Sequence, residues 1–570
     1  KDVDYLVRDD QVVLIDRYTG RGRPDTRYHY GLQAALEVKE GVPVQPEHEV
    51  LGRISVRGFV SQYSNVSGMT GTAMSSKSEF RRAYGLDVVA VPPSKPVKRT
   101  DLEPRMYFSK GDKYQAILEE VRFCQKMGRP VLIGTHSIEE CDAISQLLKL
   151  NGIEHNLLNA ANDLEEHRII NEAGLFGSVT VATDMAGRGT DIILETGLDR
   201  RIAGRYVTLV GEFLAQGVGV VTLDCPAKDA AEVFLSAIGT ANLECRVATV
   251  RDGARIDVIV SAPEENTHDR TVSLEFGLGL YVIGAGSSDN ARIDYQLRGR
   301  SGRQGDFGAS RFIWSSEDGL LKSAGDAGPA SSGLAGARSD LAGQAFREGE
   351  SLTRYLEKLQ RGAERDAESR RARTEEYTRV FEAQSFAYYR ARKEILSMES
   401  FQPFLCRLVA AKAGQLAQKY FPQMLVDDYE RQFTGLREEL YLDYKVSASS
   451  LRGLDLNLLQ HEIAILIEVV LDQTRERFTG AEFGKLATLL YLKTSDELWR
   501  DHMAYAQSLI LSTQLCSADG RGELASYTLA SFESYEHFQS QIVDIFLPKL
   551  AAFPNALTGE PPPPQIEIFE

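Results

Sequence analysis

The stretch Tyr295–Asp306, YQLRGRSGRQGD, decides which fold and chemistry to expect of this chain. It contains the pattern Q-x-x-G-R-x-G-R, with Gln296 at its start and with Arg300 and Arg303 each following a glycine. Glycines let the backbone turn tightly, so both guanidinium groups can face one point. A planar, always-charged guanidinium pairs bidentately with phosphate oxygens. The stretch therefore predicts a phosphate-binding pair of arginines; the alternative is a basic surface loop.

A second glycine-rich segment precedes it. Ala182–Ile192, ATDMAGRGTDI, follows the β-branched run Ser178–Val181. A strand that opens into such a loop leaves backbone amides free to face an anion. Ligands of open α/β sheets lie at the carboxyl ends of the strands, so we expect both motifs there.

Strand and helix signals alternate between residues 97 and 196. Helices are expected over Asp112–Lys126 and Ile138–Leu150, and strands at Val131 and Asn156–Leu158. This alternation predicts a parallel sheet covered by helices.

Residues 197–277 interrupt that pattern. A strand over Val218–Leu223, a helix over Asp229–Ile238, a hairpin around Asp252 and a strand from Thr271 predict a small α/β insert. A structural flap is a simpler interpretation of the insert than a dedicated site.

The rest of the chain reads differently. Residues 1–20 predict a strand pair, and Gly-, Ala- and Ser-rich residues 321–345 predict a flexible linker. Glu348–Met398 is charged and helix-prone, and apolar residues at helical spacing over 486–547 predict a helical hairpin.

Composition limits the classes of function. The net charge of −16 argues against a mainly nucleic-acid-binding surface. The six cysteines form no C-x-x-C, which fits reduced thiols and neither a disulfide framework nor a zinc site. No apolar run reaches the length of about 18 residues that would indicate a membrane-spanning helix.

Four motifs together resemble a known family. Besides the two above, they are GMTGTA at Gly68–Ala73 and DELWRDH at Asp496–His502. The set is similar to a superfamily-2 helicase-type motor and, more narrowly, to the SecA family of preprotein-translocase ATPases. The resemblance implies an α/β RecA-like motor lobe with a parallel sheet and a small α/β insert, then an all-α helical scaffold and helical-wing region.

The resemblance also implies domain boundaries. In chain order we expect the end of a preprotein-crosslinking domain (1–20), part of the first nucleotide-binding lobe (21–92), a second RecA-like lobe (97–196 and 278–320) with its insert (197–277), a linker (321–345), a scaffold helix (346–399), a helical wing (400–480), a two-helix finger (481–552) and a tail (553–570).

Roles for individual residues follow from the same resemblance. The expected catalytic residues are Arg300, Arg303 and Gln296. The remaining expected residues are Gly187, Arg188, Gly189, Thr190 and Asp191 for nucleotide binding, Thr70, Gly71, Thr72, Arg292 and Asp294 for coupling, and Trp499, His502, Ser517 and Ala518 for substrate contact; no metal ligand is expected.

The implied activity is ATP-driven movement of unfolded preproteins through a membrane channel, at the cytoplasmic face of the cell membrane. Expected partners are the preprotein and the channel. An anionic membrane surface and a second copy of the chain are further candidates, and no nucleic-acid partner is expected. ATP would bind with Mg²⁺, held mainly by a segment that these residues lack.

Several features depart from the family pattern. No G-x-x-x-x-G-K-[ST] occurs; the nearest stretch, Gly480–Leu486, has the wrong spacing and no hydroxyl. We therefore expect no useful ATP hydrolysis by this chain alone. Residues 284–290 carry few charges, and positions 516–518 offer no aromatic side chain to grip a polypeptide. A nucleic-acid helicase and a non-hydrolysing scaffold remain the alternatives.

Overall fold

The computed structural model forms two compact units, residues 1–47 with 66–369 and residues 48–65 with 370–570. Each unit is described by itself. The described residues are 1, 4–16, 21–28, 31–46, 52–159, 165–183, 190–226, 228–241, 245–252, 255–261, 270–321, 350–421, 429–440, 451, 454–515 and 523–558.

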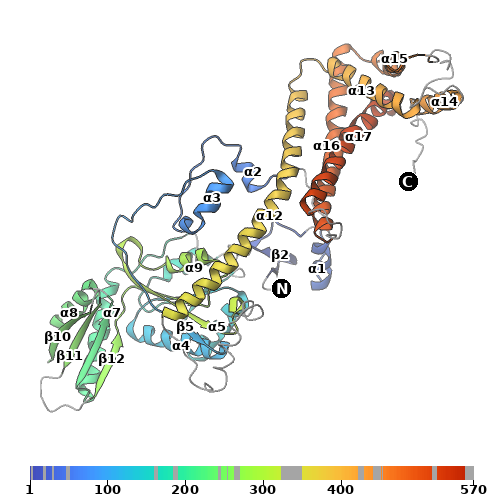
Figure 1. Cartoon of the computed structure of the whole chain (residues 1–570). Helices are drawn as coiled ribbons and strands as arrows, with labels where there is room; N and C mark the ends of the chain where they lie inside the picture. The colour runs from blue at the N-terminus through green and yellow to red at the C-terminus, as the bar shows by residue number, and fades with distance from the viewer. Residues whose placement is uncertain are drawn as a thin grey trace. The chain divides into compact units, whose positions relative to one another are not determined.

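The first unit is built on a parallel sheet, which confirms the predicted lobe (Figure 1). The strand order is β4-β14-β13-β6-β8-β7, with β5 also paired to β14, and all these pairs are parallel. The strands are β4 (Lys98–Asp101), β5 (Arg105–Tyr107), β6 (Val131–Thr135), β7 (Asn156–Leu158), β8 (Val179–Thr183), β13 (Leu280–Ala285) and β14 (Phe307–Ser315).

The central strands are made of apolar and small residues because helices cover both faces. Every residue of β6, β8 and β13 is buried. The covering helices are α4 (Lys110–Met127), α5 (Ile138–Leu150), α6 (Glu166–Glu172) and α9 (Ala291–Arg298). Serine caps begin two of them: Ser109 Oγ accepts from Asp112 N and Ser137 Oγ from Glu140 N. Polar capping thus fixes where the sheet passes into each helix.

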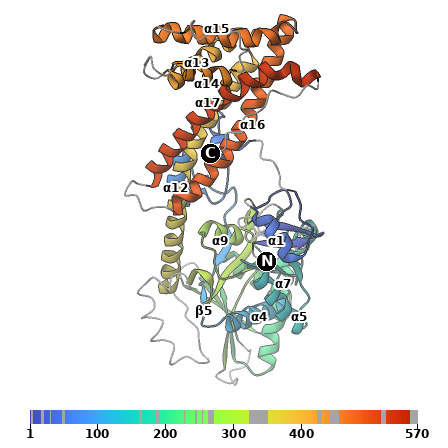
Figure 2. The same cartoon turned by 90° about the vertical axis from the view of Figure 1, so that its right-hand side faces the viewer.

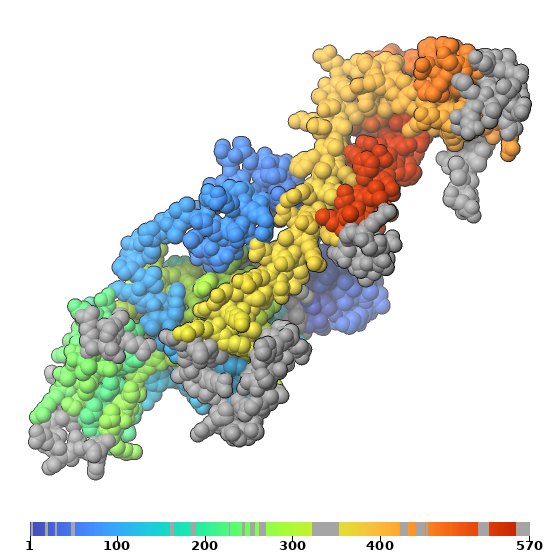
Figure 3. All heavy atoms as spheres, viewed as in Figure 1, coloured from blue at the N-terminus to red at the C-terminus, as the bar shows by residue number. Residues whose placement is uncertain are grey.

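The insert forms a separate mixed sheet in the order β10-β11-β9-β12, and it protrudes from the lobe in the space-filling view (Figure 3). Its strands are β9 (Val220–Cys225), β10 (Arg246–Asp252), β11 (Arg255–Ser261) and β12 (Thr271–Glu275), with helices α7 (Leu198–Ala215) and α8 (Lys228–Thr240). The predicted strands and α8 are confirmed. Helix α7 was not predicted, although its buried residues Leu198, Ile202, Tyr206 and Val210 recur every fourth position.

The amino-terminal part of the first unit confirms the predicted strand pair. β1 (Tyr5–Arg8) and β2 (Gln11–Ile15) are antiparallel, and both turn residues, Asp9 and Asp10, have positive φ. Strand β3 (Gly22–Arg23), helix α1 (Leu32–Glu40), the 3₁₀ turn η1 (Ala73–Ser76) and helix α3 (Lys77–Tyr84) follow.

The second unit is helical. Helix α12 (Glu350–Leu396) is shared: its residues up to Ser369 belong to the first unit, and those from Arg370 belong to this one. Figure 2 shows α16 (Gly480–Leu515) and α17 (Glu523–Thr558) side by side, with α13 (Gln402–Tyr420), α14 (Tyr429–Glu439) and α15 (Leu456–Arg475) gathered at one end of the pair. The short helix α2 (Val56–Val60) also belongs to this unit.

The predicted helical hairpin is confirmed as α16 and α17, and the predicted long helix as α12, each with ends that differ from the prediction. Helix α17 continues to Thr558, six residues beyond the expected end of the finger at 552. Two predicted segments lie almost wholly outside the described residues: the linker at 321–345 and the turn between α16 and α17. Within the described part of the chain, no helix is long and apolar enough to cross a bilayer.

Candidate functional site

The arginine motif occupies the turn between α9 and β14. Asn290 caps α9 by accepting from Arg292 N at 3.0 Å. After the helix, Gly302 adopts φ 70°, and a Cβ there would lie 2.5 Å from the Cβ of Arg99 on β4. Only glycine fits both the conformation and the space. The chain then enters the short turn η4 (Arg303–Gly305), and the two arginines are held one on each side of Gly302.

Arg300 is the more buried of the two arginines, with 2 % of its surface exposed. Its Nη1 donates to the carbonyl oxygen of Thr190. Its Nε and Nη2 are buried and have no hydrogen-bond partner among the described residues. Burial lowers the pKa of the Arg300 guanidinium to about 10, and the charge of Arg303 acts in the same direction. A buried cation with unused donors makes this a favourable place for an anion.

Arg303 contacts Asp191, the residue that follows Thr190 in the chain. Its Nη1 lies 2.5 Å from Asp191 Oδ1, and its Nε donates to Gly299 O at 2.8 Å. Arg300 and Arg303 thus converge on consecutive residues, Thr190 and Asp191. The structure brings together the two motifs that the sequence singled out.

The edge of the sheet at which they meet differs from the prediction. Ser301 Oγ donates to the carbonyl oxygen of Leu280, the first residue of β13, at 2.7 Å. The arginine segment therefore lies at the amino ends of β13 and β14, because α9 returns the chain from the carboxyl edge. Residues 190–195 also return toward the amino end of β8, because Glu195 N donates to the carbonyl oxygen of Gly174, which precedes that strand in the chain. The expectation that both motifs lie at the carboxyl ends is wrong for the arginines.

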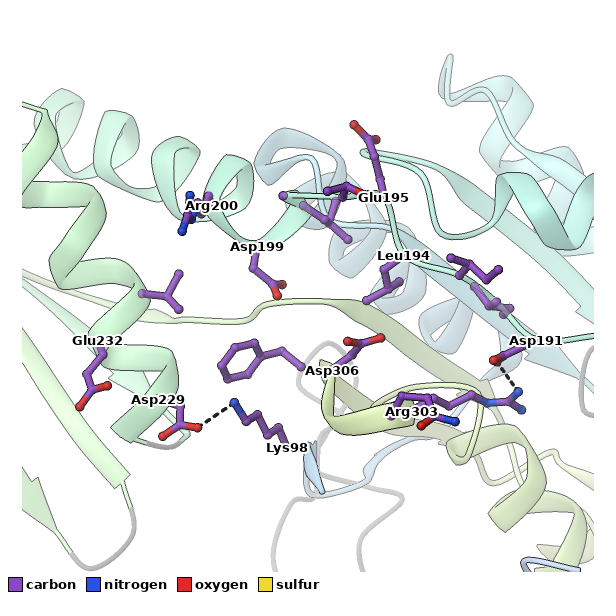
Figure 4. Close-up of a pocket in the computed structure, with 18 of the residues that line it drawn as sticks. Lys98, Asp191, Leu194, Glu195, Asp199, Arg200, Asp229, Glu232, Arg303 and Asp306 are labelled. Carbon is purple, nitrogen blue, oxygen red and sulfur yellow. Dashed lines mark hydrogen bonds and ion pairs between the residues drawn. The ribbon is translucent and has the colours of Figure 1, made fainter. Parts of the chain in front are cut away.

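An open pocket of about 860 Å³ adjoins Arg303 and Asp191 (Figure 4). It lies between the insert helices α7 and α8 and the lobe residues around Asp306. Lys98 on β4 pairs with Asp229 on α8 at 2.8 Å, which ties the insert to the lobe. The sequence analysis missed this pocket, because its walls come from segments far apart in the chain.

The remaining catalytic and coupling candidates lie in two places in the first unit, helix α9 and the loop at residues 70–72. Gln296 and Arg292 lie on α9, and Asp294 between them is buried and accepts from Ser288 N at 3.0 Å. Burial raises the pKa of Asp294, partly offset by the nearby His136. Thr70 and Thr72 sit in an exposed loop, where their hydroxyls are 3.3 Å apart, and Gly71 lies between them in open space.

Five predicted residues lie outside the described residues: Gly187, Arg188, Gly189, Ser517 and Ala518. Their expected roles stay predictions. Within the described ranges, no group of three or more His, Cys, Asp or Glu side chains is placed to hold a metal ion.

Trp499 and His502 are packing residues of the helical unit. The ring of Trp499 stacks on Tyr388, with centroids 4.4 Å apart and planes 12° apart. His502 Nε2 donates to Gln384 Oε1 at 3.0 Å, and its Nδ1 is hydrogen-bonded to Ser534 Oγ at 3.1 Å. Burial lowers the pKa of His502 to about 4. These positions favour a bracing role over direct contact with a substrate.

The helical unit should lose stability as the pH falls from about 6.5 to 4. Unfolded histidine titrates near 6.5, so in this window the unfolded chain binds the extra proton and the folded chain does not. The loss is on the order of 3 kcal/mol. We expect His502→Gln to flatten the dependence of urea-unfolding midpoints on pH, while the exposed-site control His461→Gln keeps it. An equally steep dependence in His502→Gln would show that this histidine does not titrate as described.

Comparisons with known proteins cover almost the same residues as the folded units. Family models described as the SecA DEAD-like domain, the SecA P-loop domain, and the SecA wing and scaffold domain match residues 6–81, 96–328 and 348–553. The chain is 33 % identical over 552 residues to the protein translocase subunit SecA of Pelotomaculum thermopropionicum, covering 96 % of the chain and 58 % of that protein. It is 32 % identical over 559 residues to that of Nitrosococcus oceani, covering 95 % and 55 %. The chain thus spans little more than half the length of these relatives.

Proposed function

Because the chain belongs to the SecA family, we propose that it is part of an ATP-driven translocase that moves unfolded preproteins through a membrane channel. The observation that supports this most directly is Arg300. A guanidinium that is 2 % exposed, with two nitrogens unpartnered among the described residues, is costly unless an anion completes it. The γ-phosphate of ATP is an anion of the right geometry for such a fork.

The two arginines divide the work in this proposal. Arg300 would stabilise charge that develops on the transferred phosphoryl group, since it already points to the segment that would face the nucleotide. Arg303 would reach the same group once it exchanges part of its pairing with Asp191. Gln296, near the end of α9 ahead of both arginines, would help position the γ-phosphate. Thr190, Asp191 and the preceding glycine loop would contact the ribose or phosphates.

A second set of residues would relay the nucleotide state. Thr70, Gly71 and Thr72 would do so from the first lobe, and Arg292 and Asp294 from α9, the helix that precedes the arginines. ATP with Mg²⁺ is the substrate that the SecA family implies. In this proposal ATP and Mg²⁺ are held mainly by a segment that these residues lack.

The helical unit would convert closure of the cleft into movement of a polypeptide. α16 and α17 form a long hairpin that packs on α12 through an aromatic cluster around Trp499. We place the protein at the cytoplasmic face of the cell membrane, with the preprotein and its channel as partners, an anionic lipid surface as a further contact and a homodimer as one assembly.

Two other functions share part of this evidence. A nucleic-acid helicase of the same superfamily would use similar arginines, but a net charge of −16 opposes tight binding to a phosphate backbone. A non-hydrolysing scaffold would retain the fold and lose the chemistry.

We expect the purified 570-residue chain to hydrolyse ATP no faster than background. Positioning of the phosphates needs both sides of the cleft, and no phosphate-cradling motif is present here. A completed motor, in which a relative supplies the part of SecA that this chain does not span, should turn over within the usual range of about 1–10³ s⁻¹.

The match of residues 96–328 to the SecA P-loop domain lends no support to inactivity, so this measurement decides it. The control is Arg300→Ala purified in the same way, which exposes contaminating ATPases. Turnover in the enzymatic range by the chain alone, lost in Arg300→Ala, would mean that these residues suffice for hydrolysis.

A further inference from the structure

Two side chains near the start of α12 contact the beginning of α9. Gln360 Nε2 donates to Asp294 Oδ2 at 2.6 Å and to the carbonyl oxygen of Ser288 at 2.9 Å. Glu364 Oε1 accepts from Ala291 N at 2.9 Å. Positions 360 and 364 are one helical turn apart and so share one face of α12. All of these residues belong to the first unit.

These contacts satisfy groups that would otherwise be costly. Ala291 N is one of the first amides of α9, which have no partner inside their own helix. A carboxylate at this end also interacts favourably with the helix dipole. Asp294 is buried and accepts from Ser288 N and from Gln360, so its carboxylate depends on donors that both α12 and the 286–290 loop provide.

Apolar packing holds α9 from both sides. A Cβ at Gly134 on β6 would lie 2.4 Å from Leu297, so α9 approaches the sheet as closely as glycine allows. On α12, Leu356 belongs to the same apolar cluster as Leu297, and Leu359 and Ala363 pack against that cluster. Because α9 lies between the sheet and α12, a shift of α9 must break either packing or the contacts of Gln360 and Glu364.

We infer that Gln360 and Glu364 are positioning residues for the arginine pair: they hold the start of α9 and thereby set where Arg300 lies. Arg300 follows α9 by only two residues, so the position of the helix limits where Arg300 can lie. The consequence for nucleotide binding rests on the proposed function. Coupling is reciprocal. An anion that fixes Arg300 therefore strengthens the contacts of α9 with α12, and loss of those contacts weakens anion binding at Arg300.

Hydrogen exchange measured by mass spectrometry on the full chain tests the inference directly. The variants are Gln360→Leu, Glu364→Ala and Glu364→Gln, and the last keeps an acceptor oxygen for Ala291 N. The matched control is Arg361→Ala, because Arg361 is on an exposed face and its hydrogen bonds to described residues both go to Glu357 in the same helix. Each variant of the chain is measured without nucleotide, and the completed motor with and without Glu364→Ala is measured without nucleotide and with ATP.

Without nucleotide, we expect Gln360→Leu and Glu364→Ala to raise exchange several-fold in residues 286–301, with β6 and β8 unchanged. Glu364→Gln and Arg361→Ala should match the parent chain. Unchanged exchange at 286–301 in both Gln360→Leu and Glu364→Ala would overturn the inference. If Gln360→Leu unfolds the lobe, the contrast between Glu364→Ala and Glu364→Gln still decides.

The ATP arm separates the inference from the proposed function. We expect ATP to slow exchange in residues 286–301 and 353–366 of the completed motor, and to do so less when the motor carries Glu364→Ala. If ATP changes nothing in the completed motor while Glu364→Ala still loosens α9, the positioning role stands and the nucleotide role of Arg300 is contradicted.

Discussion

Arg300→Ala is expected to lower the ATP turnover of the completed motor by about 10³–10⁵-fold while leaving the fold intact. The reason is geometric. Arg300 is anchored by Thr190 O and is 2 % exposed, and two of its nitrogens have no hydrogen-bond partner among the described residues, so its charge is available to a ligand. The loss should fall mainly on kcat, because charge on the phosphoryl group develops in the transition state.

Arg303→Ala should fall in the same range, since Arg303 meets the segment next to Arg300 through Asp191. The matched control is Arg200→Ala, which removes an exposed arginine from the wall of the adjoining pocket. The measurements are steady-state ATP hydrolysis and thermal unfolding of each variant. Turnover near that of the parent in both Arg300→Ala and Arg303→Ala, with unchanged unfolding, would make these arginines structural only.

Local patterns in the sequence predicted most of the fold. The runs Val131–Thr135 and Val179–Thr183 are uniformly apolar or small because both faces of the sheet are covered. Asp9 and Asp10 marked a tight turn, and both take the positive φ that such turns require. These features depend on near neighbours, so the sequence displays them.

Helix α7 was missed for a different reason. The predicted α/β insert began at residue 197, but no element was assigned ahead of the strand at Val218. The buried residues of α7 pack with Phe276 and with strand β9, which come later in the chain. These packing partners cannot be read from the local sequence of the helix.

The candidate site was only half predictable. Spacing identified Arg300 and Arg303, and the structure brings them to Thr190 and Asp191. The edge of the sheet was predicted wrongly, because the length of α9 determines where the chain returns. The contacts of Gln360 and Glu364 were missed, since they cross 66 to 73 positions of sequence.

Polypeptide, and not nucleic acid, should raise the ATPase rate of the completed motor. The hairpin of α16 and α17 offers a long helical surface, and the chain carries a net charge of −16. Binding to DNA or RNA would rely on neutralised phosphates and would weaken steeply with salt, through release of counterions. The tip of the hairpin lacks an aromatic side chain at 516–518, so the stimulation is expected to be smaller than that of a relative with one.

The most direct test of the central claim is the ATPase rate of the completed motor with each ligand in turn, at 50 mM and 200 mM salt or thereabouts. The ligands are an unfolded secretory protein with channel-containing membranes, the membranes alone, DNA and RNA. We expect the rate to rise only with the polypeptide and its channel, and to change little with salt. Strong, salt-sensitive stimulation by DNA or RNA alone would contradict the translocase assignment, and no stimulation by any ligand would favour a scaffold.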